Sequence, residues 1–316
     1  MKTFLNLSIL SFLLLFFNQC QKKPYSVLEN RWSEERAWRW KKDNGWMVGT
    51  NFNPSTSINQ LEFWQEDTFD PETIKRELEW SAELGMNLHR VYLHNLLWDQ
   101  DSLGFLKRID NYLKISESYG IKTLLVLLDD VWHPVPKLGK QPEPIPYVHN
   151  SGWVQAPGSA ILGDSLRHNE LKNYIKGIIS HFSDDNRVVG WDLYNEPDNI
   201  SPSYPRYPGR EPEVKEKHIY SLSLLKRAFK WAREVNPCQP LTVGLWKEPN
   251  TWSALDSLSP IDKFAILNSD VISFHAYGDL NETRNKIEDL EKYNRPLLCT
   301  EYLARGEDNT FQKMLP

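Results

Sequence analysis

The sequence is short of cysteine, of glycine-rich loops and of excess basic charge, and each shortage excludes a class of protein. Three cysteines in 316 residues are too few for a disulfide scaffold, and Cys238 and Cys299 lack the spacing of metal ligands. The sequence leaves open whether these two cysteines form one disulfide bond. No glycine-rich loop follows an early apolar segment, which argues against a nucleotide-binding sheet. With 37 Lys and Arg against 42 Asp and Glu, the net charge of -5 lacks the basic excess that nucleic-acid binding needs.

A strongly apolar stretch at the N-terminus is too short to span a membrane. It runs from Phe4 to Phe17 after Lys2, about fourteen residues where a spanning helix needs about twenty. We therefore expect residues 1–20 to be a signal peptide that exports the protein. Cys20 is placed as in a bacterial lipoprotein signal, although the residues before it depart from the usual small-residue pattern. The sequence leaves open three fates of this segment: lipidation at Cys20, ordinary cleavage, or retention as an uncleaved anchor. We expect the protein in the outer membrane as a lipoprotein, in the periplasm or in the medium.

Beyond residue 44, short apolar runs alternate with longer amphipathic ones, which is typical of repeated βα units around a parallel sheet. One expected helix runs from Pro71 to Leu84, with Asp70 as its N-cap. We expect residues 45–316 to form one α/β domain, a TIM (β/α)8 barrel, after a linker and lead-in helix over 21–44. A doubly wound open sheet is the alternative. The expected strands are 46–52, 87–93, 121–128, 188–194, 241–246, 271–275 and 296–302.

Only seven strands fit before Pro316, and an eight-unit barrel needs one more. We therefore expect a barrel that lacks its last βα unit in this chain. A strand that the apolar pattern does not reveal, or an open sheet, would also explain why only seven strands are expected.

Aromatic residues and two long connections indicate where a ligand could bind. Thirteen tryptophans are above ordinary usage, and an indole can stack on a sugar ring as well as pack a core. Trp132 lies in the first long connection, 129–167, and the second is 198–212. Both follow expected strands, on the side of such folds where ligand-binding loops gather. Long irregular loops in a compact domain are uncommon unless they are functional.

Two glutamates stand at the ends of expected strands. Glu196 follows an apolar strand and Asn195, and Pro197 then stops further ladder donation; Glu301 ends the seventh strand in the same way. A single glutamate in this position is more often part of a surface salt bridge. Two that project from the same ends of a barrel match what glycoside cleavage needs, one carboxylic acid to protonate the leaving oxygen and one carboxylate to attack or to activate water.

The run Val189 to Asp198, Val-Gly-Trp-Asp-Leu-Tyr-Asn-Glu-Pro-Asp, resembles the signature of glycoside hydrolase family 5, the cellulase family, within the clan of (β/α)8-barrel retaining glycosidases. The resemblance implies that Glu196, at the end of the fourth strand, is the acid/base. It implies equally that Glu301, at the end of the seventh strand, is the nucleophile. The whole chain also resembles exported cellulase-like or xylanase-like proteins of bacteria.

The resemblance extends to residues that support the nucleophile. Arg90, in Leu-His-Arg-Val-Tyr, is similar to the family's arginine that hydrogen-bonds the nucleophile, and its charge would favour an ionised Glu301. The pair His275 and Tyr277 looks like the family's His-x-Tyr, in which the tyrosine orients the nucleophile and the histidine contacts sugar. An ion-pair arginine and a buried structural histidine are the alternatives.

Other positions are assigned to the sugar. Asn195 would hydrogen-bond the 2-hydroxyl, a contact that strengthens in the transition state. Trp246 could form the floor of a sugar subsite, Trp132 is a candidate from the first long loop, and Asn53 is a weaker one. At the end of the third strand the family usually has a histidine, whereas this chain has Asp129 and the residue after it is again Asp.

We therefore expect a retaining hydrolase that cleaves a β-linked polysaccharide or oligosaccharide, of cellulase, mannanase or xylanase type, by double displacement. The alternative is a surface lipoprotein that binds carbohydrate on a degenerate barrel. No cofactor is expected. A metal site is not expected either, because the side chains of His89 and His94 do not share a strand face.

Overall fold

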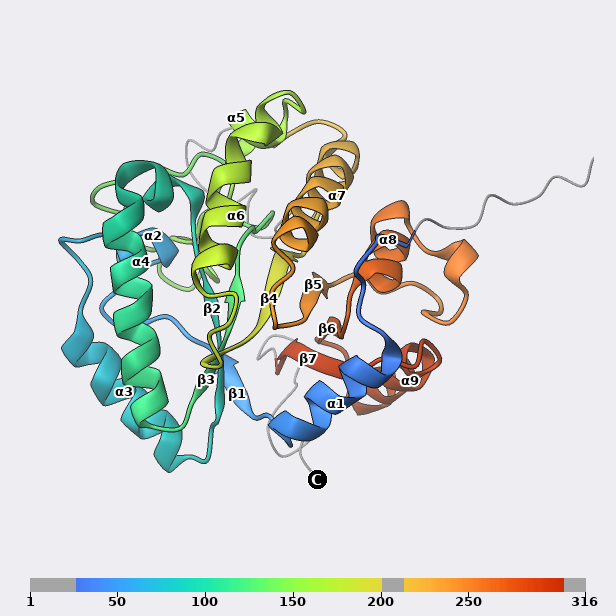
Figure 1. Cartoon of the computed structure of the whole chain (residues 1–316). Coiled ribbons are helices and arrows are strands. Elements are labelled where there is room, and N and C mark those ends of the chain that lie inside the picture. The colour runs from blue at the N-terminus through green and yellow to red at the C-terminus, as the bar shows by residue number, and fades with distance from the viewer. Residues whose placement is uncertain (1–26, 201–212, 304–316) are drawn as a thin grey trace, which may run out of the picture.

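Seven parallel strands form one sheet in the order of the sequence, so each strand pairs with the next one along the chain (Figure 1). The structure is a computed structural model that describes residues 27–200 and 213–303. This arrangement confirms the predicted barrel class and all seven predicted strands, with ends that differ by a few residues. The strands are β1 (Gly49–Asn51), β2 (Leu88–Tyr92), β3 (Lys122–Val126), β4 (Val188–Asn195), β5 (Leu241–Leu245), β6 (Ile272–Ala276) and β7 (Leu297–Tyr302).

The sheet curves into a nearly closed barrel with helices outside it (Figure 1). In the described residues the first and last strands share no backbone pairing. A side chain bridges them instead, because the Asn51 amide Nδ2 donates to the Thr300 carbonyl at 3.0 Å. An eighth strand does not occur in the described ranges, 27–200 and 213–303, and the barrel therefore has a seam between β1 and β7.

The helices begin where the sequence supplies caps. The Asp70 side chain accepts a hydrogen bond from the Thr73 amide, and Pro71 stands in the first turn, where its missing N–H costs nothing. Asp279 forms a capping box with Glu282, which satisfies two otherwise free amides. The helices are α1 (Glu34–Asn44), α2 (Gln60–Trp64), α3 (Pro71–Glu83), α4 (Asn95–Ser118), α5 (Ser159–Leu162), α6 (Lys172–His181), α7 (Lys217–Val235), α8 (Pro260–Asn268) and α9 (Leu280–Glu291).

The core lies between the strands and this outer layer. Every residue of β4 is buried, as expected for a parallel strand that is covered on both faces. Large aromatic side chains fill the space on the side of α2 and α4, where Trp64 and Phe63 stack with ring centroids 4.0 Å apart. Burial of such rings contributes favourably to the free energy of folding on this side of the barrel.

The segment before α1 is tied to the barrel. The Leu28 amide donates to Asn268 Oδ1 and the Trp32 amide to Asp270 Oδ1, each at 2.8 Å. Asp270 also accepts from Arg233 Nη2 at 2.7 Å, and both side chains are buried. A lead-in helix is thus present as α1, within the segment where it was predicted.

The predictions of a signal peptide, of lipidation at Cys20, of a second long connection and of a possible disulfide have different outcomes in the structure. Residues 1–20 and Cys20, on which the predictions of export and lipidation rest, lie outside the described residues, as do 201–212 of the second long connection. Cys238 and Cys299 are both free and exposed, so the disulfide that the sequence left open does not form. None of the helices in the described part has the length and apolarity required to cross a membrane.

Candidate active site

Glu196 lies where β4 ends and the chain turns. Its φ of 42° falls in the left-handed region that residues with side chains seldom adopt. Hydrogen bonds to the segment after β3 and to β5 hold this turn: the Asn195 amide donates to Leu128 O at 2.7 Å and the Glu196 amide donates to Gly244 O at 3.1 Å. The direction of the Glu196 side chain is therefore fixed, and only 9% of that side chain is exposed.

Glu301 lies on β7, opposite His275 of β6. The register of these two strands shifts next to His275, and such an irregularity re-aims the side chains beside it. The carboxylate of Glu301 accepts hydrogen bonds from Arg90 Nη1 at 2.7 Å and from the Tyr92 hydroxyl at 3.0 Å. Its second oxygen accepts one from the Tyr277 hydroxyl. Three donors thus surround a carboxylate that is 16% exposed, which favours the ionised form.

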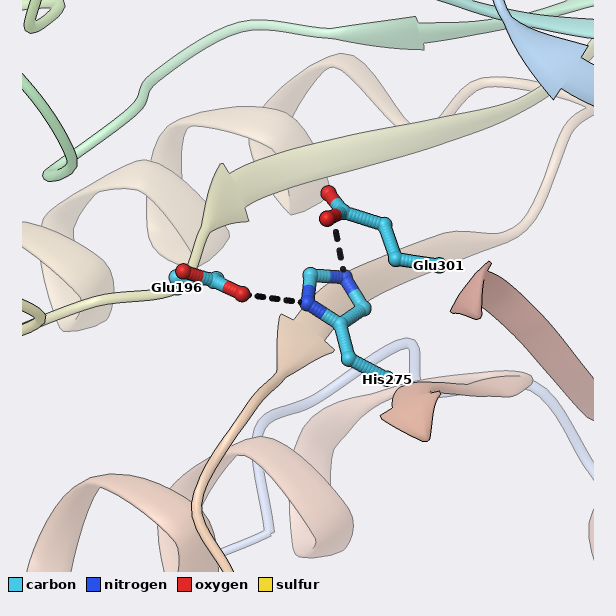
Figure 2. A group of neighbouring side chains, drawn as sticks. All are labelled: Glu196, His275 and Glu301. Carbon is cyan, nitrogen blue, oxygen red and sulfur yellow. Dashed lines mark hydrogen bonds and ion pairs between the residues drawn. The ribbon is translucent and has the colours of Figure 1, made fainter. Parts of the chain in front are cut away.

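His275 lies between the two glutamates (Figure 2). Its Nδ1 is 2.5 Å from Glu196 Oε1, and its Nε2 is 3.5 Å from Glu301 Oε1. One carboxylate oxygen of each glutamate and one histidine nitrogen all lie within 4.8 Å of one another. The structure therefore brings together the two predicted catalytic carboxylates with the predicted histidine between them.

Arg90 is the buried cation of the site, with 3% of its side chain exposed. Besides Glu301 it contacts β4, because Nη2 donates to Asp192 Oδ2 and to Asn195 Oδ1, each at 2.7 Å. Its Nη1 also reaches Asn51 Oδ1 at 3.0 Å. A planar guanidinium can make these contacts at once, whereas a lysine ammonium cannot. Arg90 therefore joins β1, β2, β4 and β7 at one point.

The surroundings of Glu301 set its ionisation. Burial alone would raise the pKa of this carboxyl, but electrostatic interactions with His275 and Arg90 and the hydrogen bond from Tyr277 outweigh burial and lower the pKa to about 2. Burial raises the pKa of the Tyr277 hydroxyl, and the charge of Glu301 raises it further, so this hydroxyl remains a donor. Glu301 is a carboxylate throughout the ordinary pH range.

Two residues that the sequence analysis did not name hold the Glu196 side of the site. Asn199 Nδ2 donates to Glu196 Oε2 at 2.5 Å, and the carbonyl of Asn199 accepts from the buried ammonium of Lys217 at 2.9 Å. The Asn199 amide also donates to the Glu196 carbonyl at 3.0 Å. The turn after β4 is thus anchored to α7, although three and twenty-one residues separate these partners from Glu196 in the sequence.

Gly244 of β5 leaves room at the centre of the site. A Cβ at this position would lie 3.1 Å from Arg90 Nη2, from Asn195 Oδ1 and from His275 Nε2, closer than most real Cβ contacts. A larger residue would push on three site side chains at once. We infer that glycine is needed here for close approach and not for its backbone freedom.

Three of the predicted sugar-binding residues contact other parts of the molecule than the two glutamate side chains. Asn53 donates to Ser57 O at 2.6 Å and so stabilises its own turn after β1. Trp132 packs edge-on against His149, with ring centroids 5.3 Å apart, in the loop after β3. Trp246 directly follows β5 and donates from its indole to Pro197 O at 3.1 Å. Only Trp246 contacts the turn that carries Glu196.

Some of the unpredicted site residues had a signal in the sequence. Tyr92 is two residues after Arg90 on the same strand, so period-two alternation places both side chains on one face. Asp192 is a charged residue inside an apolar strand, which requires a buried partner. Asn199 and Gly244 carried no signal, because their roles depend on contacts between distant segments.

Glu196, His275 and Glu301 could between them offer ligand atoms to a metal ion. However, the Arg90 guanidinium lies 2.7 Å from the same Glu301 oxygen that faces His275. A cation there would meet this fixed positive charge, and the hydrogen bonds already described account for the arrangement without one.

Comparisons with known proteins agree with the fold. The cellulase model, glycosyl hydrolase family 5, matches residues 47–313. The chain is similar to the endo-1,4-β-mannanase of Rhizomucor miehei, with 16% identity, 81% of each chain covered and a TM-score of 0.51. It is also similar to the β-1,4-D-mannanase of Cryptopygus antarcticus, with 12% identity, 80% of this chain and 78% of that chain covered, and a TM-score of 0.51. At these identities the likeness shows the fold alone.

One further structural comparison shows how much of a longer protein this chain spans. A match to GH5_18 from Streptomyces cattleya has 12% identity and a TM-score of 0.44, and it covers 72% of this chain. This chain spans 52% of the length of that protein. No curated protein matches the sequence.

Proposed function

The chain belongs to the cellulase family, glycosyl hydrolase family 5, and we propose that it hydrolyses a β-linked polysaccharide or oligosaccharide with retention of the anomeric configuration. The single observation that carries this proposal is the separation of the two glutamates, one oxygen of each within 4.8 Å of the other. Retaining glycosidases hold their carboxyl groups about 5 to 5.5 Å apart, whereas inverting ones leave about 6.5 to 9.5 Å for a water molecule. The separation supports retention.

The roles follow from the surroundings of each carboxyl group. Glu301, held as an anion by Arg90 and Tyr277, attacks the anomeric carbon and displaces the leaving oxygen. Glu196 gives a proton to that oxygen and then removes one from the water that hydrolyses the glycosyl-enzyme. The nucleophile is regenerated as the bond between sugar and Glu301 breaks. Asn195 is placed beside Arg90 to donate to the sugar's 2-hydroxyl.

The location of the protein is a second part of the proposal. The apolar stretch after Lys2 and the position of Cys20 support export, with lipidation at Cys20 as the means of attachment to a membrane. Incorporation of labelled palmitate into the wild-type chain, with Cys20→Ala as the matched control, tests the attachment. Equal labelling of the two chains would contradict it.

The activity is tested by reducing-sugar release from β-glucan, xylan and mannan. We expect the wild-type enzyme to cleave at least one of these polymers and Glu301→Gln to lose turnover of it, by roughly a thousandfold or more. Glu196→Gln should lose as much on the polymer but should still react once with a dinitrophenyl glycoside, since that leaving group needs no acid. Glu66→Gln, a change at an exposed position after α2, is the control and should retain activity. Binding of the polymers without cleavage would favour a carbohydrate-binding protein instead.

A further inference from the structure

An aspartate after the third strand, Asp129, is not one of the hydrogen-bond partners described above for the two glutamates. Asp129 comes shortly after β3, and its side chain and backbone are 1% exposed. Its amide donates to Ala156 O at 2.6 Å, and the residue also forms a parallel bridge with Asn195. Asp129 is thereby fixed between β4 and the returning end of the long loop that follows β3.

The carboxyl group of Asp129 receives three donors. Oδ1 accepts from Asn195 Nδ2 at 2.9 Å and from the Val131 amide at 3.0 Å. Oδ2 accepts from the indole Nε1 of Trp153 at 3.2 Å. Both oxygens therefore act as acceptors toward the protein, and two of the three donors are side chains at the site.

The first of these side chains, Asn195, is held in one orientation. A guanidinium has no acceptor, so the Asn195 atom that faces Arg90 Nη2 at 2.7 Å must be the carbonyl oxygen. The amide nitrogen must then face Asp129, and it keeps one further hydrogen for a ligand. Without Asp129 the nitrogen would lose the acceptor that holds its plane.

The second side chain, Trp153, lies against the nucleophile's support. Its ring packs edge-on to Tyr92, with centroids 5.5 Å apart and planes at 86°, and Tyr92 donates to Glu301. Trp153 is only partly buried. An indole that is held at one end by Asp129 and is partly exposed can stack on the C–H face of a sugar.

We propose that Asp129 is a positioning residue for the sugar at the cleaved bond, which orients the Asn195 amide toward the 2-hydroxyl and the Trp153 ring toward the sugar face. The inference rests on the proposed function. Through Asp129, the segment after the third strand helps to recognise the hydroxyl group at carbon 2 of the sugar. The ligand is therefore a β-glycoside with a free 2-hydroxyl. Asp129 acts only through its two partners and does not contact the reacting atoms.

The test uses dinitrophenyl β-cellobioside and β-mannobioside, together with the analogue of each that lacks the 2-hydroxyl on the sugar next to the leaving group. Asp129→Asn replaces one oxygen, which has lone pairs to accept a hydrogen bond whether or not the carboxyl is protonated, with an amide nitrogen that can only donate, so the variant cannot accept from both Asn195 and Trp153. We expect its kcat/KM on the hydroxylated probes to fall by roughly tenfold or more. On the 2-deoxy probes the fall should be less than about threefold, because the contact that Asn195 would make is already absent.

Matched variants separate the two partners. Trp153→Phe keeps a ring but removes the indole N–H, and it should reduce kcat/KM on hydroxylated and 2-deoxy probes alike. Asp262→Asn changes another buried aspartate, on α8. It should alter kcat/KM neither on the hydroxylated probes nor on the 2-deoxy probes. Circular dichroism and melting temperature confirm that each variant folds, and Asp129→Ala serves as a second removal of the acceptor.

The outcomes distinguish the inference from the function on which it rests. A wild-type enzyme that turns over none of the probes and releases no reducing sugar from β-glucan, xylan or mannan contradicts the proposed function and the inference with it. A wild-type enzyme that is active while Asp129→Asn and Asp129→Ala lose equal factors on hydroxylated and 2-deoxy probes overturns the inference alone, since Asp129 would then be a purely structural residue.

Discussion

Asp129→Asn also changes how the stability of the protein depends on pH, and the structure gives the size of the effect. Burial raises the pKa of Asp129 to about 8, and the nearby negative charge of Glu196 adds to this, against the hydrogen bonds from Asn195 and Val131 that favour the charged form. The folded protein therefore keeps this carboxyl protonated near neutral pH. The unfolded chain, in which the ordinary value of 3.8 applies, does not.

The sign follows from proton counting. Where the folded state binds one proton more than the unfolded state, the free energy of unfolding falls as pH rises. The contribution of Asp129 is fully present below the unfolded pKa and is lost as pH rises through about 8. One group changes the free energy by about 1.4 kcal/mol per pH unit, so from about pH 5 to about pH 7 the wild-type protein should lose about 3 kcal/mol that the non-titrating asparagine variant does not lose.

Urea unfolding followed by tryptophan fluorescence at several pH values measures this difference. The other titrating groups are common to both proteins and cancel in the comparison. The gap between wild type and Asp129→Asn should narrow with rising pH and become constant above about pH 9. A gap that is independent of pH, or one that widens in favour of the wild type, would refute the assignment of a protonated Asp129.

Three further variants test other parts of the site. Tyr277→Phe removes a donor that helps to lower the pKa of Glu301, so the acid limb of the kcat/KM profile should move to higher pH; an unchanged limb would contradict the role of this hydroxyl. Gly244→Ala places a methyl group against three site side chains and should lower kcat/KM by roughly tenfold while circular dichroism stays unchanged; full activity would show that the site can yield. Lys217→Met removes the ammonium that pairs with the partly buried Glu213 at 3.1 Å and donates to the Asp130 and Asn199 carbonyls, which should cost about 1 to 3 kcal/mol in urea unfolding; a loss below about 0.5 kcal/mol would contradict a structural role for this ammonium.

Most of the barrel could be predicted from the sequence because strands buried on both faces leave continuous apolar runs. Val188 to Tyr194 is such a run, and the structure extends it by one residue to Asn195. The expected first strand, 46–52, is longer than β1 as observed, Gly49–Asn51. Trp46 is exposed there, so its apolar character did not reflect a place in the sheet.

The site could be predicted in part because both glutamates lie at the carboxyl ends of strands, Glu196 directly after β4 and Glu301 next to the last residue of β7. Arg90 and Tyr277 were named on resemblance, and the structure places both against Glu301. Asn53 was favoured for its position after a strand, but its amide instead closes a local turn with Ser57. Position along the chain does not decide which backbone groups a side chain meets.

The contacts that the sequence did not indicate join segments that are far apart in the chain. Asp129 meets Trp153 across the long loop, and Lys217 reaches back from α7 to Asn199. These partners are set by how the loop packs against β4, and no periodicity or motif describes that packing. The aspartate at the end of β3 was visible as a departure from the family, yet its role needed the structure.

The most direct test of the central claim is to trap the glycosyl-enzyme with a dinitrophenyl 2-deoxy-2-fluoro-β-glycoside of the sugar that the enzyme cleaves, and to locate the label by mass spectrometry of peptides. We expect one sugar per chain, attached to Glu301, and no label on the Glu301→Gln variant. A label on Glu196, or complete absence of a label together with products of inverted configuration, would contradict this expectation.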